Sequence, residues 1–145
     1  MEVNQFHIPG LLELKPRILS DDRGLFFESF RQDVLQAQGA NAVFVQDNQS
    51  FSRKHVLRGI HFQRQPYEQG KLVRVIMGKA LDVAVDLRPG SDTFGQHLAL
   101  VLDSEKNNML YIPEGFGHGF LALDDCILHY KCTAYYQATH DEGIK

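Results

Sequence analysis

The sequence predicts an all-β protein, closed as an antiparallel sandwich or barrel, and two features of the chain carry this prediction. Apolar runs of about four to eight residues recur along the chain, which is typical of short strands. Gly, Pro, Asn and Asp separate these runs, as in Arg88–Ser91 and at Glu114-Gly115, and they favour turns. A sandwich or barrel leaves few strand edges unpaired, so it is the natural closure for many such strands.

The predicted elements follow one another with little room for helix. Only Arg31–Gln38 has a helical pattern, and Gly39 after it is a stop signal. The predicted strands are Gly24–Phe30, Ala42–Gln46, Val56–Phe62, Leu72–Met77, Ala80–Leu87, Gly95–Leu102, Leu110–Ile112, His118–Leu123 and Ile127–Thr133.

The run Ala80–Leu87 alternates with a period of two. Leucines and valines at the odd positions face one way, while Asp82 and Asp86 face the other way with Ala84. Two interpretations of Asp82 stay open. Either Asp82 lies on an inner face beside a binding cavity, or its side of the strand faces solvent.

Length and composition limit the classes of protein to which the chain can belong. Its 145 residues favour one compact domain over residues 1–145, and 43% hydrophobic residues can fill one core. The formal net charge of -3 argues against a general nucleic-acid binder. A few placed Arg and Lys side chains still suffice for a diphosphate, so a small anionic ligand is compatible with this charge.

The sequence also predicts a cytoplasmic protein with no membrane partner. Cys126 and Cys132 are too few for a disulfide framework, which favours a reducing compartment. Residues 1–10 lack the basic region and apolar run of a signal peptide, and no apolar stretch is long enough to cross a bilayer.

Two segments resemble the two cupin motifs. Residues 56–73 read VLRGIHFQRQPYEQGKLV, and residues 111–121 read YIPEGFGHGFL. The matching positions are His61, Gln63, Glu68 and Gly78 in the first motif, and Pro113, Gly115 and His118 in the second.

The first motif departs from the pattern of metal-binding cupins. Those proteins use two His, one Glu and a third His, a set that suits iron or manganese. In this chain Gln63 replaces the second His, which removes an imidazole ligand. We therefore predict no metal and no other cofactor, and a remnant site of His61, Glu68 and His118 is the alternative.

Read as a whole, the chain resembles the dTDP-4-dehydrorhamnose 3,5-epimerase family. The resemblance covers nearly all of the sequence and implies a jelly-roll cupin, a homodimer and catalysis without a metal. The blocks that carry it, in order, are Asp22–Gly24, Phe26–Glu28, Phe44–Asn48, Val56–His61, Gly70–Val73, Asp82–Arg88, Pro113–Phe120 and Tyr130–Tyr136.

The chemistry of such a reaction explains three of the residues. A ketone at C4 of a sugar acidifies the protons on C3 and C5, and epimerisation needs a base, an acid on the opposite face and a group that holds the enolate charge. His61 is the predicted base, because imidazole titrates near neutral pH. Lys71 is the predicted cation and Tyr130 the predicted acid. By similarity, all three match the family's catalytic positions.

The remaining matches imply binding roles. Arg23 and Phe26 resemble residues of a neighbouring subunit that hold the phosphates and stack on the base. Arg58 would bind the diphosphate, since a guanidinium fork suits phosphate oxygens. The other predicted binding residues are Glu28, Gln46 and Asn48 at the nucleoside, His118 at the sugar and Tyr136 in the pocket wall.

Strand parity sets a condition on two of these residues. In a regular strand Arg58 and His61 would point to opposite faces, because their sequence positions differ by an odd number. A bulge at Gly59 would bring both side chains into one pocket.

The chain departs from the family at its end. Family members usually continue with a tail that supplies a carboxylate to the catalytic His, whereas this sequence ends at Lys145. Asp82 is the candidate replacement as an orienting carboxylate, and it could equally serve His118. The departure leaves open whether C5 is inverted with C3, and whether the nucleotide is dTDP or CDP.

The sequence thus predicts a metal-free epimerase acting at C3 of a nucleoside-diphosphate 4-keto-6-deoxyhexose, in a pathway to a deoxysugar of a bacterial surface polysaccharide. A 3,4-ketoisomerase on the same scaffold is the nearest alternative. A non-catalytic cupin that binds a sugar nucleotide is the alternative from another class.

Overall fold

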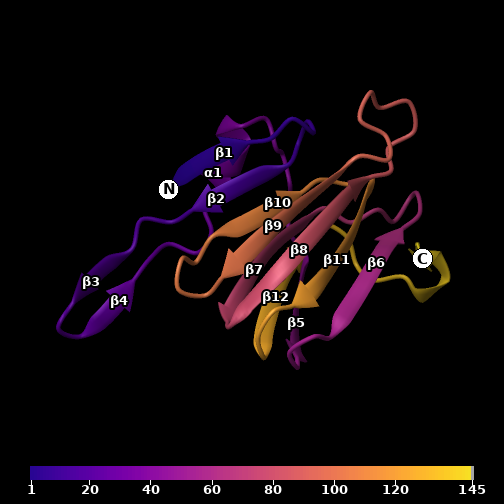
Figure 1. Cartoon of the computed structure of the whole chain (residues 1–145). Helices are drawn as coiled ribbons and strands as arrows, with labels where there is room; N and C mark the ends of the chain where they lie inside the picture. The colour runs from indigo at the N-terminus through magenta and orange to yellow at the C-terminus, as the bar shows by residue number, and fades with distance from the viewer. Residues whose placement is uncertain (145) are drawn as a thin grey trace.

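The computed structural model describes residues 1–144, and two facing antiparallel sheets form its body (Figure 1). This architecture confirms the predicted all-β fold. The six-stranded sheet has the order β1 (Glu2–Gln5), β2 (Leu12–Lys15), β10 (Met109–Ile112), β7 (Lys71–Met77), β12 (Cys126–Cys132) and β5 (Gln46–Ser52). The five-stranded sheet has the order β13 (Asp141–Gly143), β6 (Leu57–Gln63), β11 (Phe116–Ala122), β8 (Lys79–Asp86) and β9 (His97–Asp103).

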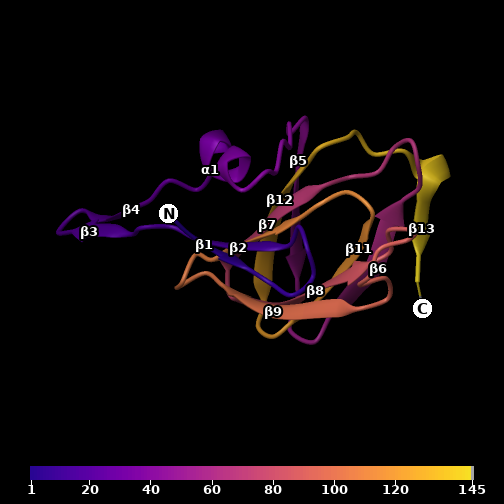
Figure 2. The same ribbon diagram turned by 90° about the horizontal axis from the view of Figure 1, so that it is seen from above.

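Three small elements lie outside these sheets. The hairpin of β3 (Leu19–Asp21) and β4 (Gly24–Phe26) projects away from the body of the molecule (Figures 1 and 2). The helix α1 (Gln32–Ala37) lies within the segment predicted to be helical, and one 3-10 turn, Ala138–His140, precedes β13. None of the helices found in residues 1–144 is long and apolar enough to cross a membrane.

Apolar side chains form two cores. The first fills the space between the two sheets, with residues such as Val73, Val75, Leu110, Leu128 and Phe120. The second lies on the outer face of the six-stranded sheet, where α1 covers it (Figure 2). Its buried members are Leu12, Leu14, Leu35, Ala42, Leu72, Met109 and Tyr111. Polar positions between the sheets can therefore only be tolerated where a cavity or a partner satisfies them.

The strand β8 has its aspartates on the inner face. Asp82 and Asp86 are fully buried together with Ala80 and Ala84, whereas the leucine and valines between them are only half-buried. Of the two interpretations that the sequence left open for Asp82, the structure therefore selects the inner one.

The condition set by Arg58 and His61 is met by a bulge in β6. His61 pairs with His118 and Arg58 pairs with Phe120, so Gly59 and Ile60 together oppose the single residue between those partners. Gly59 has φ 106°, and a Cβ there would lie 2.6 Å from the backbone of β11. Only glycine fits this position, and the bulge predicted at Gly59 is confirmed.

Several strands differ from the prediction. β1, β2 and β3 were not predicted at all, the predicted strand Gly24–Phe30 ends at Phe26, and residues 42–45 are irregular. β5 was missed because its inward positions are Gln46, Asn48, Ser50 and Ser52, so no apolar alternation marks it.

Candidate active site

A cavity of about 560 Å³ lies between the sheets, and it collects most of the predicted site residues. β5, β6, β7, β11 and β12 contribute to its wall, together with the segment that follows β12. The predicted residues that line it are Asn48, Arg58, His61, Lys71, His118, Tyr130 and Tyr136.

The three predicted catalytic residues come from both sides of this cavity. His61 stands on β6 of the five-stranded sheet, while Lys71 and Tyr130 stand on neighbouring strands of the six-stranded sheet. Nζ of Lys71 lies 5.6 Å from the centroid of the Tyr130 ring. A ligand between the sheets would thus meet the imidazole on one face, and the phenol and the amine on the other.

Burial shifts the pKa of two of these groups. It raises the pKa of Tyr130, so the phenol keeps its proton at neutral pH and can act as an acid. Burial also lowers the pKa of Lys71, an effect that nearby negative charges, including that of Asp82, oppose. An ammonium in such a poorly hydrated place interacts strongly with any negative charge that develops beside it.

Asp82 serves His118. Its two carboxylate oxygens lie 3.0 and 2.9 Å from Nε2 of His118, and both side chains are buried. Of the two histidines for which the sequence proposed Asp82 as an orienting carboxylate, the structure pairs it with His118 and not with His61.

Arg58 is anchored at the edge of the cavity. Its Nε donates to Oγ of Ser52 at 2.9 Å, and one terminal nitrogen donates to the carbonyl of Phe51 at 3.2 Å. Both acceptors lie at the end of β5, so they fix the guanidinium while its other N–H groups stay available to a ligand.

Gln46 does not line the cavity but supports two residues that do. Its Nε2 donates to Oδ1 of Asn48 at 3.0 Å, and its Oε1 accepts the backbone N–H of Tyr136 at 3.0 Å. Of the two residues on this strand predicted to contact the nucleoside, Asn48 thus lines the cavity and Gln46 lies behind it.

Arg23, Phe26 and Glu28 are not brought to this cavity within one chain. Arg23 and Phe26 stand on the projecting β3–β4 hairpin, where the Arg23 side chain is 90% exposed and pairs with neighbouring Asp21. Glu28 follows the hairpin and lies 3.5 Å from Arg31. Within one chain these three residues therefore lie outside the cavity that contains His61.

The sequence interpretation missed some residues that line the cavity. Asp141 is the charged one, and its Oδ2 accepts a hydrogen bond from the Tyr136 hydroxyl at 3.3 Å. It lies in a polar run near the end of the chain, where no pattern distinguishes it from a solvated carboxylate. The uncharged ones include Ser50, Gln69 and Phe120.

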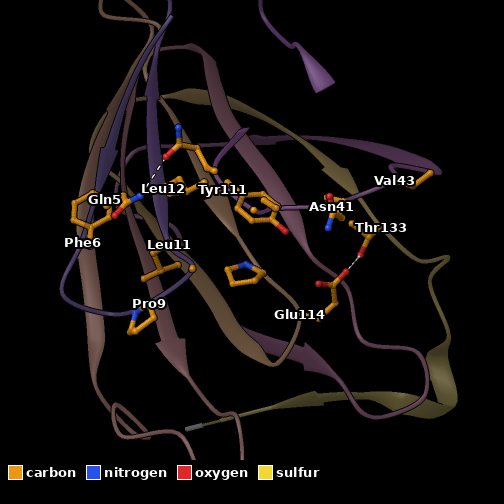
Figure 3. A pocket seen from close by; sticks show the side chains of 16 residues that line it. Gln5, Phe6, Pro9, Leu11, Leu12, Asn41, Val43, Tyr111, Glu114 and Thr133 are labelled. Carbon is orange, nitrogen blue, oxygen red and sulfur yellow. Dashed lines mark hydrogen bonds between the residues drawn. The ribbon is translucent and has the colours of Figure 1, made fainter. Parts of the chain in front are cut away.

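A larger cavity of about 730 Å³ lies elsewhere and contains none of the predicted residues (Figure 3). In its wall the hydroxyl of Thr133 donates a hydrogen bond to Oε1 of Glu114 at 2.6 Å. Burial raises the pKa of Tyr111, which also lines this cavity, to about 12. No histidine, lysine or arginine is among the residues that line this larger cavity, so we assign the active site to the smaller cavity between the sheets.

The donor set does not favour a metal. Within residues 1–144 no group of three His, Cys, Asp or Glu side chains is placed to hold an ion. Gln63 is occupied by three backbone groups, and Glu68 is not among the residues that line the cavity. The remnant metal site considered for His61, Glu68 and His118 therefore lacks its carboxylate.

Comparisons with known proteins identify the family of the chain. The family model described as dTDP-4-dehydrorhamnose 3,5-epimerase matches residues 5–145. The enzyme of that name from Methanothermobacter thermautotrophicus is 50% identical over 138 residues, which cover 94% of this chain and 74% of the relative.

Solved structures give the same result. The dTDP-6-deoxy-D-glucose-3,5-epimerase of Legionella pneumophila, in complex with dTDP-4-keto-L-rhamnose, is 43% identical with a TM-score of 0.94, covering 99% of this chain and 77% of that one. A 3'-monoepimerase of Streptomyces bikiniensis, in complex with dTDP-quinovose, is 37% identical with a TM-score of 0.89, covering 97% and 72%. On this evidence the chain belongs to the dTDP-4-dehydrorhamnose 3,5-epimerase family.

Proposed function

We propose that the protein is an epimerase of dTDP-linked 4-keto-6-deoxyhexoses that inverts C3, and C5 in the same cavity. The observation that carries the proposal is the placement of His61 and Tyr130 on opposite sheets, facing one cavity. Inversion of a carbon requires a proton to leave on one face and to return on the other, and this arrangement supplies a group for each.

In the proposed reaction His61 removes the proton from C3. The electron pair of the C–H bond moves into the C3–C4 bond, and the C4 oxygen becomes an enolate oxyanion. Tyr130 then donates its phenolic proton to the opposite face of C3, and the carbonyl at C4 re-forms. Solvent removes the proton from the imidazolium and returns one to the tyrosinate, which completes the cycle.

Lys71 is the proposed partner of the oxyanion. It stands on the same sheet as Tyr130, and its ammonium lies in a poorly hydrated wall. A cation fixed at this place stabilises the enolate more than the ketone, which is what lowers the barrier.

Binding is assigned to the rim of the cavity. We propose that Arg58 holds the diphosphate, that Asn48 and Tyr136 contact the nucleoside, and that His118, held by Asp82, contacts the sugar. The dTDP-sugars bound in the related structures support a thymidine nucleotide.

We further propose a homodimer in which the partner's β3–β4 hairpin completes the site with Arg23 and Phe26. Leu19, Leu25 and Phe26 are 50%, 61% and 66% exposed on this hairpin. A lone two-stranded hairpin is only marginally stable in water, so apolar residues at these positions favour cover by a second chain.

The test is proton NMR in heavy water with the 4-keto-6-deoxyglucose nucleotide, in its dTDP and CDP forms. We expect the C3 and C5 signals to disappear with the dTDP form, because each carbon takes up deuterium from solvent. The form whose protons exchange faster identifies the preferred nucleotide. Loss of the C3 signal alone would identify a 3-epimerase.

Two outcomes would overturn the proposal. A product with its ketone moved to C3 would identify a 3,4-ketoisomerase. No exchange at either carbon, with the protein folded and the nucleotide bound, would leave a sugar-nucleotide-binding protein without catalysis.

A further inference from the structure

The segment Ala134–Gln137, which follows β12, lies outside both sheets and is held by glutamine side chains. It leads from the six-stranded sheet to β13 of the five-stranded sheet (Figure 2), and it carries Tyr136 into the cavity wall. Each of these four consecutive residues has one backbone group hydrogen-bonded to a glutamine side chain. The carbonyl of Ala134 accepts from Gln69 at 2.9 Å, the carbonyl of Tyr135 accepts from Gln63 at 3.3 Å, the N–H of Tyr136 donates to Gln46 at 3.0 Å and the N–H of Gln137 donates to Gln63 at 2.7 Å.

Gln63 differs from the other two glutamines because it binds on both sides of Tyr136. Its Nε2 donates to the carbonyl of Tyr135, the residue before the tyrosine, and its Oε1 accepts the N–H of Gln137, the residue after it. The same Nε2 donates to the carbonyl of Tyr67 at 2.5 Å. These partners fix the orientation of the amide, since the nitrogen faces two carbonyls and the oxygen faces an N–H.

Gln63 is also buried and lies behind the cavity. Only 6% of it is exposed, and it is not among the residues that line the cavity, whereas Gln69 is. It is the last residue of β6, two residues after His61. A short and stiff connection therefore links the strand of the proposed base to the tyrosine of the proposed nucleoside site.

We infer that Gln63 is the positioning residue for Tyr136 and sets the affinity of the site for the nucleotide without touching the ligand. The inference rests on the proposed function, because it assigns Tyr136 to the nucleoside. The Gln63 amide is hydrogen-bonded to the peptide groups on both sides of Tyr136, and this limits rotation of the backbone there. The tyrosine ring is therefore ordered before the ligand binds. Loss of these hydrogen bonds weakens binding and leaves proton transfer at His61 and Tyr130 intact.

The first variant is Gln63→Met, which keeps the length of the side chain and removes its donors and its acceptor. We expect KM for the dTDP-sugar to rise roughly 5- to 30-fold, while kcat changes less than about twofold. Gln96→Met, an exposed glutamine ahead of β9, is the matched control and should leave both constants unchanged. A fall in kcat with KM unchanged would overturn the inference.

A double-mutant cycle separates positioning from a general loss of structure. If Gln63 acts through Tyr136, then Gln63→Met should raise KM less than about twofold in a Tyr136→Ala background. Additive effects of the two changes would contradict the inference, since Gln63 would then act by another route.

A measurement without catalysis keeps the inference testable if the proposed function fails. With fluorotyrosine in all five tyrosines, the fluorine NMR signals of Tyr136, Tyr135 and Tyr67 should shift or broaden in Gln63→Met, while those of Tyr111 and Tyr130 stay in place. An unchanged Tyr136 signal would refute the positioning role whatever the enzyme does. If all five signals collapse, Gln63→Asn is measured in its place, and the same two outcomes apply to it.

Discussion

Asp82 and His118 form a buried pair in which one imidazole nitrogen faces both carboxylate oxygens, at 2.9 and 3.0 Å. Because both oxygens face the same ring nitrogen, the pair fixes the orientation of the imidazole and leaves its other ring nitrogen free of Asp82. The pair joins β8 to β11 and thereby places the imidazole in the wall of the cavity.

Asp82→Asn should therefore weaken both the fold and the site. The amide keeps the shape of the carboxylate but loses its charge, so we expect a loss of about 1.5–3 kcal/mol in the free energy of unfolding and roughly 10- to 100-fold in kcat/KM. Thermal denaturation and steady-state kinetics check the two effects. Wild-type kinetics in a stable Asp82→Asn protein would show that the orientation of His118 is irrelevant to the reaction.

Removing Tyr130 and removing His61 should have different effects on deuterium exchange at C3. In Tyr130→Phe, His61 can still remove the C3 proton and return a deuteron to the same face, so C3 should exchange in heavy water without forming the epimer. In His61→Asn both exchange and product should fall by about 10²–10⁴-fold. Proton NMR follows exchange and product in one experiment.

The control for these variants is His97→Asn, because His97 is exposed at the start of β9, outside the cavity. It should behave as the wild type. The assignment of the two faces would be contradicted by the reverse pattern, in which Tyr130→Phe abolishes exchange and His61→Asn retains it.

Lys71 should cost stability while it serves catalysis. Burial lowers its pKa in the folded protein below the ordinary lysine value of 10.5, so the ammonium is better tolerated in the unfolded chain. The cost of burying the ammonium lowers the free energy of unfolding by its full amount at pH values below the folded pKa of Lys71. The cost decreases as the pH rises toward the unfolded pKa. Lys71→Met should therefore raise Tm at pH 7, and the gain should shrink toward pH 10.5.

The same substitution should lower kcat by about 10²-fold or more, because the enolate loses its cation. In the wild type, activity should fall as pH rises through the lowered lysine pKa. Tm measured at pH 7 and pH 10, with kcat at pH 7, checks the prediction. A variant that is both less stable and fully active would contradict both statements.

The sequence predicted the fold class and the bulge at Gly59 because they rest on local signals, namely apolar alternation and a glycine between two residues of conflicting parity. It did not predict β5, since the inward positions of that strand are polar and break the alternation on which detection depends, and two of them, Asn48 and Ser50, line the cavity. Nor could it choose between His61 and His118 as the partner of Asp82, because that depends on the register of β8 and β11.

The residues around Tyr136 could not be predicted for a related reason. Gln63 and Asp141 form hydrogen bonds with the irregular segment that contains Tyr136, and Asp141 itself lies on the short edge strand β13. Contacts there are made by single side chains, so no repeating sequence pattern marks them. Gln63 was noticed only as a missing metal ligand, whereas its bonds to backbone groups about 70 residues along the chain appear in the structure alone.

Asp86 anchors the turn after β8 and should make stability depend on acid pH. Its buried carboxylate accepts hydrogen bonds from Arg88, Ser91 and Thr93, and Arg88 holds its pKa well below the usual range. Because the pKa of Asp86 is lower in the folded than in the unfolded chain, its carboxylate stabilises the fold fully at pH values above the unfolded pKa of about 3.8. This stabilisation is lost as the pH falls toward the folded pKa. Asp86→Asn should therefore lose about 2–4 kcal/mol at pH 7, and less at pH 3.

The control is Asp92→Asn, because Asp92 is exposed in the same turn. It should unfold like the wild type at both pH values. Thermal melts at pH 7 and pH 3 measure the difference between the two variants, and a deficit of Asp86→Asn that is equal at both pH values would exclude the ion pair as its cause.

The position of Arg23 far from the cavity of its own chain makes a prediction about mixed dimers. Arg23→Ala and His61→Asn should each be nearly inactive alone, since one lacks a phosphate contact and the other lacks the base. When the two chains are co-expressed, half of the dimers are mixed, and each mixed dimer holds one site with an intact His61 and an intact Arg23 from its partner. We therefore expect about a quarter of the wild-type activity to return.

If Arg23 acted in its own chain, every site of a mixed dimer would carry one defect and no activity would return. His61→Asn co-expressed with Tyr130→Phe is the matched control, because both residues line the cavity of the same chain and no site can be repaired. Recovery with the first pair and none with the second assigns the hairpin to the partner's site. Recovery with neither, in protein that sediments as a dimer, would restrict the hairpin to holding the two chains together.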